Sequence, residues 1–109
     1  MLMRTLDIER AAGLFAAIGA PARLAVLQTL VRAGTRGLSV GELRAGTDLP
    51  ASTLAHHLAA MVRVGLVLQE KSGRNVMNRA NLEQLQGLAD YLLAECCQDE
   101  ADLTAGTAA

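Results

Sequence analysis

Apolar residues recur at helical spacing in most of the chain, and glycine, proline or capping residues separate the segments. The pattern predicts helices over residues 7–18, 21–33, 39–45 and 50–64, with a last one from Asn81 to about residue 97. Pro21 fits the first turn of its helix, and Gly34 ends that helix. Ser39 followed by Glu42 predicts a capping box at the start of the third helix.

Each predicted helix except the short third one has an apolar face along which a core can form. Those faces contain Ile8, Ala11, Ala12, Phe15 and Ile18; Leu24, Leu27, Leu30 and Val31; Leu54, Leu58, Met61 and Val62; and Leu82, Leu85, Leu88, Ala89, Leu92 and Leu93.

After Gly65 the pattern changes to short runs that are typical of strands. Residues 66–70 and 75–79 are predicted to form a β-hairpin, joined by a turn over residues 71–74 with Gly73 at a position of positive φ. The third and fourth helices, with a short turn between them, have the dimensions of a helix-turn-helix. The predicted fold class is therefore mainly α with a small β-hairpin, arranged as a winged helix-turn-helix.

The charge distribution makes nucleic acid a plausible partner although the net charge is only −1. All ten Lys and Arg residues lie in residues 1–80 beside five acids, so that part carries +5, whereas residues 81–109 carry six acids and no base. The basic part favours phosphate contacts, while the acidic end stays clear of them. Unevenly charged solvated faces are the alternative interpretation of the same distribution.

The predicted recognition helix and wing supply the candidate DNA-binding residues. Ser52, Thr53 and His56 lie in the first turns of the fourth helix, which enters the major groove in this fold, and Lys71 and Arg74 lie near the hairpin tip. Each has a purely structural alternative: the two hydroxyls could cap the helix, and Arg74 could be a solvated turn charge. We expect the neighbouring His57 to be a partly buried structural residue.

The order of these motifs resembles the ArsR/SmtB family of metal-sensing repressors. The matching stretches run roughly from residue 7 to residue 97, and they are Gly19-Ala20-Pro21-Ala22-Arg23-Leu24, Ser39-Val40-Gly41-Glu42-Leu43, Leu54-Ala55-His56-His57-Leu58, Gly65-Leu66-Val67 and Gly73-Arg74. The resemblance implies a homodimer through the first and last helices that binds double-stranded operator DNA until an effector releases it. Ala55 stands where the family often has a DNA-contacting serine, which puts one contact in doubt.

Cys96 and Cys97 are the only cysteines, and they resemble the adjacent pair of arsenic-responsive members of that family. The third helix has no cysteine and no histidine follows His57, so two other metal sites of the family are absent. Two thiolates suit a soft trivalent ion better than zinc, which prefers four ligands. The predicted inducer is therefore trivalent arsenic or antimony, as arsenite, methylarsenite or antimonite, and no other cofactor is required.

Geometry suggests how such an inducer would act. Consecutive side chains on a helix point about 100° apart, so both sulfurs converge only if the helix end unwinds near residues 95–98. Ligand binding is expected to distort the helix that supports the dimer. A reversible oxidation switch through intersubunit disulfides is an alternative, as is a simple apolar role for the two cysteines.

The remaining expectations concern organisation and class. We expect one winged-helix DNA-binding and dimerisation domain over residues 1–97, followed by a flexible acidic tail over residues 98–109. No membrane span or signal peptide is predicted, which favours a cytoplasmic protein. No catalytic set is recognisable, so an enzyme is not expected. A winged-helix module for protein contact is the competing class, favoured by Ala55 and the near-neutral charge.

Overall fold

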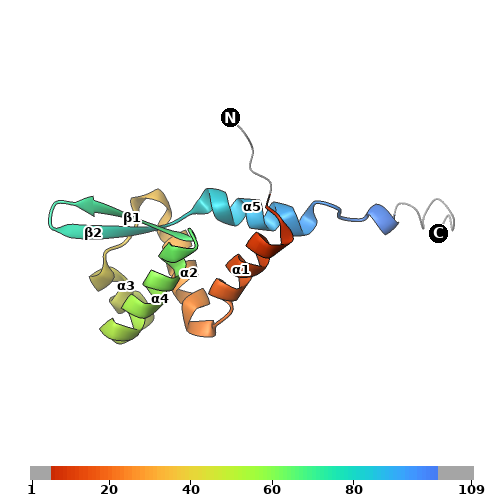
Figure 1. Cartoon of the computed structure of the whole chain (residues 1–109). Coiled ribbons are helices and arrows are strands. Elements are labelled where there is room, and N and C mark those ends of the chain that lie inside the picture. The colour runs from red at the N-terminus through yellow and green to blue at the C-terminus, as the bar shows by residue number, and fades with distance from the viewer. Residues whose placement is uncertain (1–5, 101–109) are drawn as a thin grey trace.

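The computed structural model describes residues 6–100 of the chain as one layer of helices with a protruding hairpin (Figure 1). In chain order, the elements are α1 (Ile8–Ile18), α2 (Pro21–Ala33), the 3-10 turn η1 (Gly34–Arg36), α3 (Val40–Thr47), α4 (Ala51–Arg63), β1 (Val67–Ser72), β2 (Asn75–Ala80) and α5 (Leu82–Leu93). This confirms the predicted order of helices and the winged helix-turn-helix fold.

The core is aliphatic and is formed mainly by α1, α2 and α4. Leu14, Leu30, Leu54 and Met61 are fully buried. The predicted face of α4 is correct, but the predicted face of α1 is not: Ala11, Leu14 and Ala17 are buried, whereas Phe15 is 39% exposed. The helix thus presents apolar side chains on two sides, with Leu14 in the core and Ile8 and Phe15 facing outward.

The helix ends follow from local capping, with one departure from the prediction. Ser39 Oγ accepts from the Glu42 amide at 3.2 Å, and Glu42 Oε1 accepts from the Ser39 amide at 2.9 Å, which is the predicted capping box. The third helix continues through Gly46 to Thr47, two residues past the predicted end. Asp48, with φ at 58°, ends it in the left-handed conformation that aspartate tolerates.

The wing is a two-stranded antiparallel hairpin in which Val67 pairs with Ala80 and Ser72 with Asn75. The predicted four-residue turn is wrong, because Lys71 and Ser72 belong to the first strand. The turn contains only Gly73 and Arg74, and only Gly73 has a positive φ, at 64°. Two-residue turns of this kind match the right-handed twist of paired strands.

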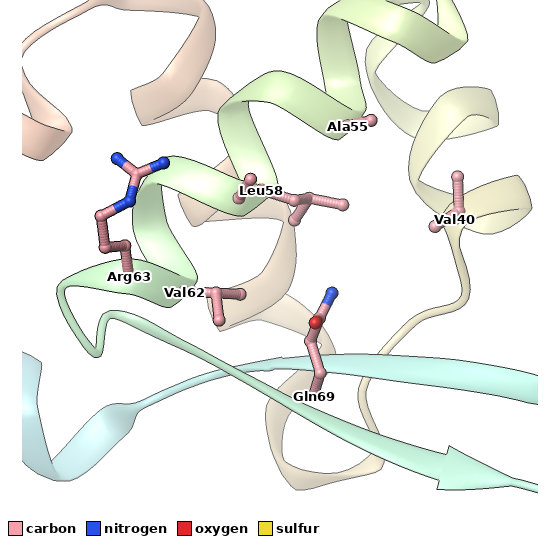
Figure 2. Close-up of a pocket in the computed structure, with 7 residues that line it drawn as sticks. Val40, Ala55, Leu58, Val62, Arg63 and Gln69 are labelled. Carbon is pink, nitrogen blue, oxygen red and sulfur yellow. The ribbon is translucent and has the colours of Figure 1, made fainter.

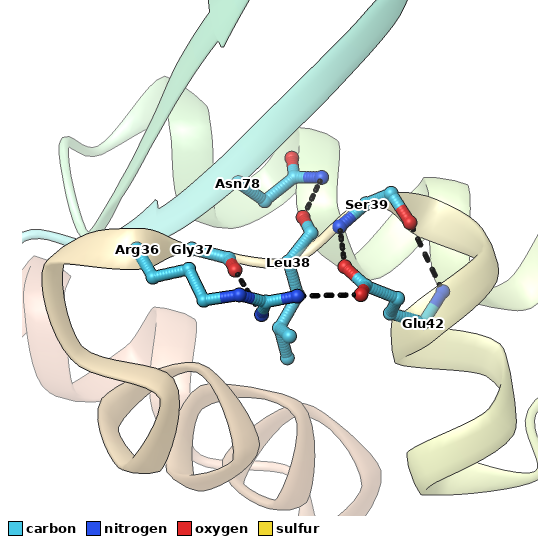
Figure 3. A network of polar contacts seen from close by, with 6 residues as sticks. All are labelled: Arg36, Gly37, Leu38, Ser39, Glu42 and Asn78. Atoms are coloured by element: carbon cyan, nitrogen blue, oxygen red, sulfur yellow. Dashed lines mark hydrogen bonds and ion pairs between the residues drawn. The ribbon is translucent and has the colours of Figure 1, made fainter.

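A polar network around the buried Asn78 attaches the wing to the helix-turn-helix (Figure 3). Leu38, in the segment between η1 and α3, forms two backbone hydrogen bonds of 2.8 Å with Asn78 in β2. The Asn78 side chain is fully buried and donates to the Leu38 carbonyl at 3.1 Å. Nearby, Arg36 forms a 2.7 Å ion pair with Glu42. Wing and helix-turn-helix therefore share one hydrogen-bonded framework.

The last helix leaves most of its apolar residues uncovered. Only Leu88 is buried, while Leu92 and Leu93 are 62% and 65% exposed. The predicted apolar face of this helix exists in sequence, but the chain itself does not bury it. α5 contacts α1, whose Ile8 is also 73% exposed. The outward apolar residues of α1 and α5, namely Ile8, Phe15, Leu92 and Leu93, are called the apolar patch below.

The last named helix ends at Leu93, before the predicted domain boundary at residue 97, and that boundary stays a prediction. Residues 98–100 form a single helical turn, and the rest of the predicted tail, residues 101–109, lies outside the described residues. Among residues 6–100, no single helix has both the length and the hydropathy to cross a membrane. One pair, Ile8–Ile18 with Pro21–Arg36, meets those criteria jointly but is bent by 97°.

Candidate nucleic-acid interface and dithiol site

The recognition helix α4 exposes its first turns without using them for capping. Pro50 is the N-cap and makes no side-chain capping bond, so neither Ser52 nor Thr53 caps the helix. Ser52 and His56 are exposed and Thr53 is half-buried. Within the described part of the chain none of the three side chains makes a hydrogen bond, so their polar atoms are available to bases or phosphates.

The recognition helix is attached to the helical body through His57. Nε of Arg23 donates to Nδ1 of His57 at 3.2 Å, and Nη1 of Arg23 donates to the Ala17 carbonyl at 3.1 Å. One guanidinium thereby links α4 to the end of α1, in agreement with the structural role expected for His57. Burial, then the charge of Arg23 and then His56, lowers the pKa of His57 below its usual value of 6.5.

This lowered pKa predicts a loss of stability in mild acid. Above pH 6.5 both the folded and the unfolded chain hold His57 neutral, and Nδ1 accepts from Arg23. Below pH 6.5 the unfolded chain takes up the proton first, so the free energy of unfolding falls until the pH passes the lowered folded pKa. Urea titrations between pH 7.5 and 5.0 test this, because the pKa of Glu42 lies below 4.5. The His57→Gln variant, which keeps an acceptor, should lose less stability over that range; an equal loss would contradict the assignment.

Two of the basic residues of the wing are exposed, whereas Arg79 is half-buried and paired with Glu70. Lys71 lies in β1 and Arg74 in the turn, and both are exposed without an ion pair in the described part of the chain. The hairpin projects at the same end of the molecule as α3 and α4 (Figure 1). The structure thus places all five predicted DNA-binding residues at that end, divided between the first turns of α4 and the wing.

A shallow apolar groove of about 420 Å³ lies beside the recognition helix (Figure 2). Its lining comes from the start of α3, one face of α4 and β1: Val40, Ala55, Leu58, Ala59, Val62, Arg63 and Gln69. The small side chains of Ala55 and Ala59 leave the space open. Sequence analysis missed Arg63 and Gln69 as residues of this end, since their placement depends on the packing of α4 against β1.

The two cysteines lie beyond the last helix, in a turn over residues 94–97. The Cys96 amide donates to the Leu93 carbonyl at 2.9 Å, Cys97 has a φ of 66°, and the two Sγ atoms are 2.9 Å apart. The prediction that the cysteines end the final helix is therefore wrong, because the helix stops at Leu93. The two sulfurs therefore converge in a segment that is not regular helix, and the effect of a ligand on this helix end stays a prediction.

Both cysteines are exposed and carry free thiols. Hydrogen bonding with Cys96, then with Glu100, and slight desolvation raise the pKa of the Cys97 thiol, so it is more protonated near neutral pH than an ordinary cysteine. Over residues 6–100 no group of three or more His, Cys, Asp or Glu side chains is placed to hold a metal ion. The cysteine pair itself offers two sulfurs, with the Glu100 carboxyl group close to Cys97.

The described features have clear counterparts among known proteins. A family model for a helix-turn-helix domain matches residues 18–70. The chain is 38% identical over 89 residues to the HTH-type transcriptional regulator YgaV of Escherichia coli K12, spanning 82% of this chain and 88% of that protein.

Two solved structures show the same architecture. The ArsR-like transcriptional regulator from Rhodococcus sp. RHA1 has a TM-score of 0.73 and 26% identity over 91% of this chain and 93% of that one. The homodimeric winged helix-turn-helix domain of Mb0332 from Mycobacterium bovis has a TM-score of 0.64 and 22% identity over 86% and 82%. Because the chain has a helix-turn-helix and a basic wing, and because these relatives share its sequence and fold, it belongs to the ArsR family of helix-turn-helix transcriptional regulators.

Proposed function

We propose that this regulator is a homodimeric repressor that leaves its operator DNA when trivalent arsenic or antimony binds Cys96 and Cys97. The observation that carries the proposal is the short distance between the two sulfurs, 2.9 Å, in an exposed turn directly after α5. Such a pair can present both sulfurs to one soft ion after a small separation of the two thiols. The turn follows Leu93 of the apolar patch, so a ligand bound there lies next to the proposed dimer contact.

The apolar patch supports the dimer. Ile8, Leu92 and Leu93 are each more than 60% exposed and lie on two helices that contact each other. Burying such side chains contributes roughly 1.5–3 kcal/mol each, which favours a second copy over water. The similar domain of Mb0332 is homodimeric. A dimer also places two recognition helices on one DNA duplex, as palindromic operators require.

The chemistry of the donors limits the inducer. Thiolates select soft acceptors, whereas zinc needs four ligands, and no group of three or more His, Cys, Asp or Glu side chains in residues 6–100 is arranged to hold a metal ion. Trivalent arsenic and antimony are three-coordinate and bind thiols strongly. Two sulfurs from this pair leave one position for a methyl group, a hydroxide or a sulfur of the second subunit. Methylarsenite, arsenite and antimonite all meet this requirement.

Fluorescence anisotropy on the DNA upstream of the gene tests the proposal. The reduced protein should bind this duplex with steep salt dependence, and each arsenical or antimonite should release it. In the Cys96→Ser/Cys97→Ser variant, binding should be unchanged, because both side chains are exposed and the chain after α5 lies away from the β1–β2 hairpin (Figure 1). Release should be lost.

Each other outcome points to a specific alternative. Release of the wild type by peroxide, reversed by a thiol reductant and not produced by arsenicals, would replace the inducer by a redox signal. DNA binding that ignores all of these reagents would keep the DNA-binding function and remove the cysteines from it. Absence of any operator preference at low salt would favour a protein-contact module.

A further inference from the structure

The recognition helix ends in a capping motif that leaves two carbonyls for other partners. The Leu66 amide donates to the Met61 carbonyl at 2.9 Å and the Gly65 amide to the Val62 carbonyl at 3.0 Å, with φ of Gly65 at 84°. This is the Schellman pattern, which satisfies the carbonyls of the last helical turn. It does not use the carbonyls of Val64 and Gly65, which follow immediately.

Side chains from both helices of the apolar patch bind these two carbonyls. Nη2 of Arg10 in α1 donates to the Val64 carbonyl at 3.1 Å, and Nδ2 of Asn81 donates to the Gly65 carbonyl at 2.8 Å. Asn81 is also the N-cap of α5, where its Oδ1 accepts from the Gln84 amide at 3.2 Å. One side chain thus joins the start of α5 to the end of α4, and a guanidinium of α1 contacts the adjacent residue.

We propose that Arg10 and Asn81 are positioning residues that fix the direction of the recognition helix relative to α1 and α5. This proposal rests on the proposed function only where DNA affinity is measured; the hydrogen bonds themselves are tested without DNA. A positive charge at the carboxyl end of α4 is also favoured by the helix dipole. Because both bonds end on two consecutive carbonyls, α1 and α5 cannot shift relative to each other without moving this segment or breaking a bond.

The length of α4 makes such a shift matter at the DNA. Thirteen residues span about 20 Å at 1.5 Å per residue, so a tilt of about 6° at the carboxyl end moves the amino end by about 2 Å. Hydrogen bonds to bases are lost well within that displacement. Ser52 and His56 lie in the turns that would move. Arg10 and Asn81 therefore transmit the relative position of the dimer helices to the side chains that face DNA.

Two variants remove the bonds while keeping the helices. Asn81→Asp keeps the Oδ1 cap of α5 but replaces the donor to Gly65, and Arg10→Met keeps the aliphatic stem but removes the donor to Val64. Gln28→Glu and Arg32→Met on α2 are matched controls, because they change charge by the same amount at exposed positions. Arg10→Lys, which keeps a donor of similar reach, is the conservative rescue.

The first readout is amide hydrogen exchange over residues 61–66 in the free protein. Exchange there should accelerate about tenfold in Arg10→Met, which loses one bond, and at least as much in Asn81→Asp, where a carboxylate oxygen would face the Gly65 carbonyl, with α2 unchanged and Arg10→Lys near wild type. The second readout is the ratio of operator to non-specific DNA affinity, which should fall by similar factors. Unchanged exchange in both variants, or equal acceleration throughout the chain, overturns the proposal. If the wild type shows no operator preference, the proposed function fails while the exchange data still decide this inference.

Discussion

Replacing both Leu92 and Leu93 by Asp is expected to convert the protein to a monomer and to weaken operator binding about 100-fold or more, since two linked half-site contacts exceed one by such factors. Both side chains are more than 60% exposed, so the substitution removes little from the core of one chain. Two acidic groups placed in the apolar patch would instead be buried unpaired between subunits, which is strongly unfavourable. The Ile8→Asp variant should act in the same direction from α1.

Sedimentation velocity and anisotropy measure the two consequences separately. The control is Val31→Asp on α2, which makes the same apolar-to-acidic change at a position that is 42% exposed and outside the apolar patch. It should leave both the mass and the operator affinity near those of the wild type. A Leu92→Asp/Leu93→Asp protein that sediments as a dimer would place the subunit contact elsewhere on the molecule.

Replacing Gly37 by Ala should destabilise the fold by about 2–6 kcal/mol, since the backbone region and the close contact each cost about 1–3 kcal/mol. Gly37 has φ 77° and ψ 176°, a region that only glycine occupies readily. A Cβ there would lie 2.8 Å from the Asn78 carbonyl oxygen and 2.9 Å from Cγ of Arg79. Asn78 is held in place by its bonds to Leu38, so the neighbouring backbone cannot easily move away.

Gly34 provides the matched control for this prediction. Its backbone has φ 68° and ψ −148°, close to that of Gly37, but nothing lies within 4 Å of a Cβ at this position. Gly34→Ala should therefore show the backbone cost alone. Urea unfolding at constant m-value measures both variants, and their difference is the cost of the collision with β2. Equal losses of stability in the two variants would mean that the chain around Gly37 can move away from β2, which would contradict the hydrogen-bonded contact shown in Figure 3.

Sequence patterns predicted elements well wherever the signal was local. Pro21 and Gly34 delimit α2, and Ser39 with Glu42 starts α3, because these residues act through their own backbone neighbourhood. The end of α3 was misjudged because Gly46 normally favours helix termination. In the structure Gly46 stays helical and lies close to α2, where a Cβ at this position would be 3.4 Å from Cγ2 of Thr29. Asp48 ends the helix instead.

The errors in α1 and in the cysteine turn have a different origin. Periodicity finds an apolar face but does not tell whether it contacts the core or a second subunit, so Phe15 was assigned to the wrong side of α1. No local signal marks the positive φ of Cys97, a residue type that rarely adopts it. The bond from Arg10 to Val64 joins residues 54 positions apart and follows only from tertiary packing.

The outward-facing leucines at the end of α5 also tie regulation to gene dosage. For a regulator that reads DNA only in pairs, the number of active molecules rises with the square of the chain concentration while dimers are scarce. Halving expression then reduces operator occupancy about fourfold in that regime rather than twofold. If such a regulator represses its own promoter, a leucine-to-alanine change in α5 that weakens the pair would raise the steady-state amount of protein in the cell.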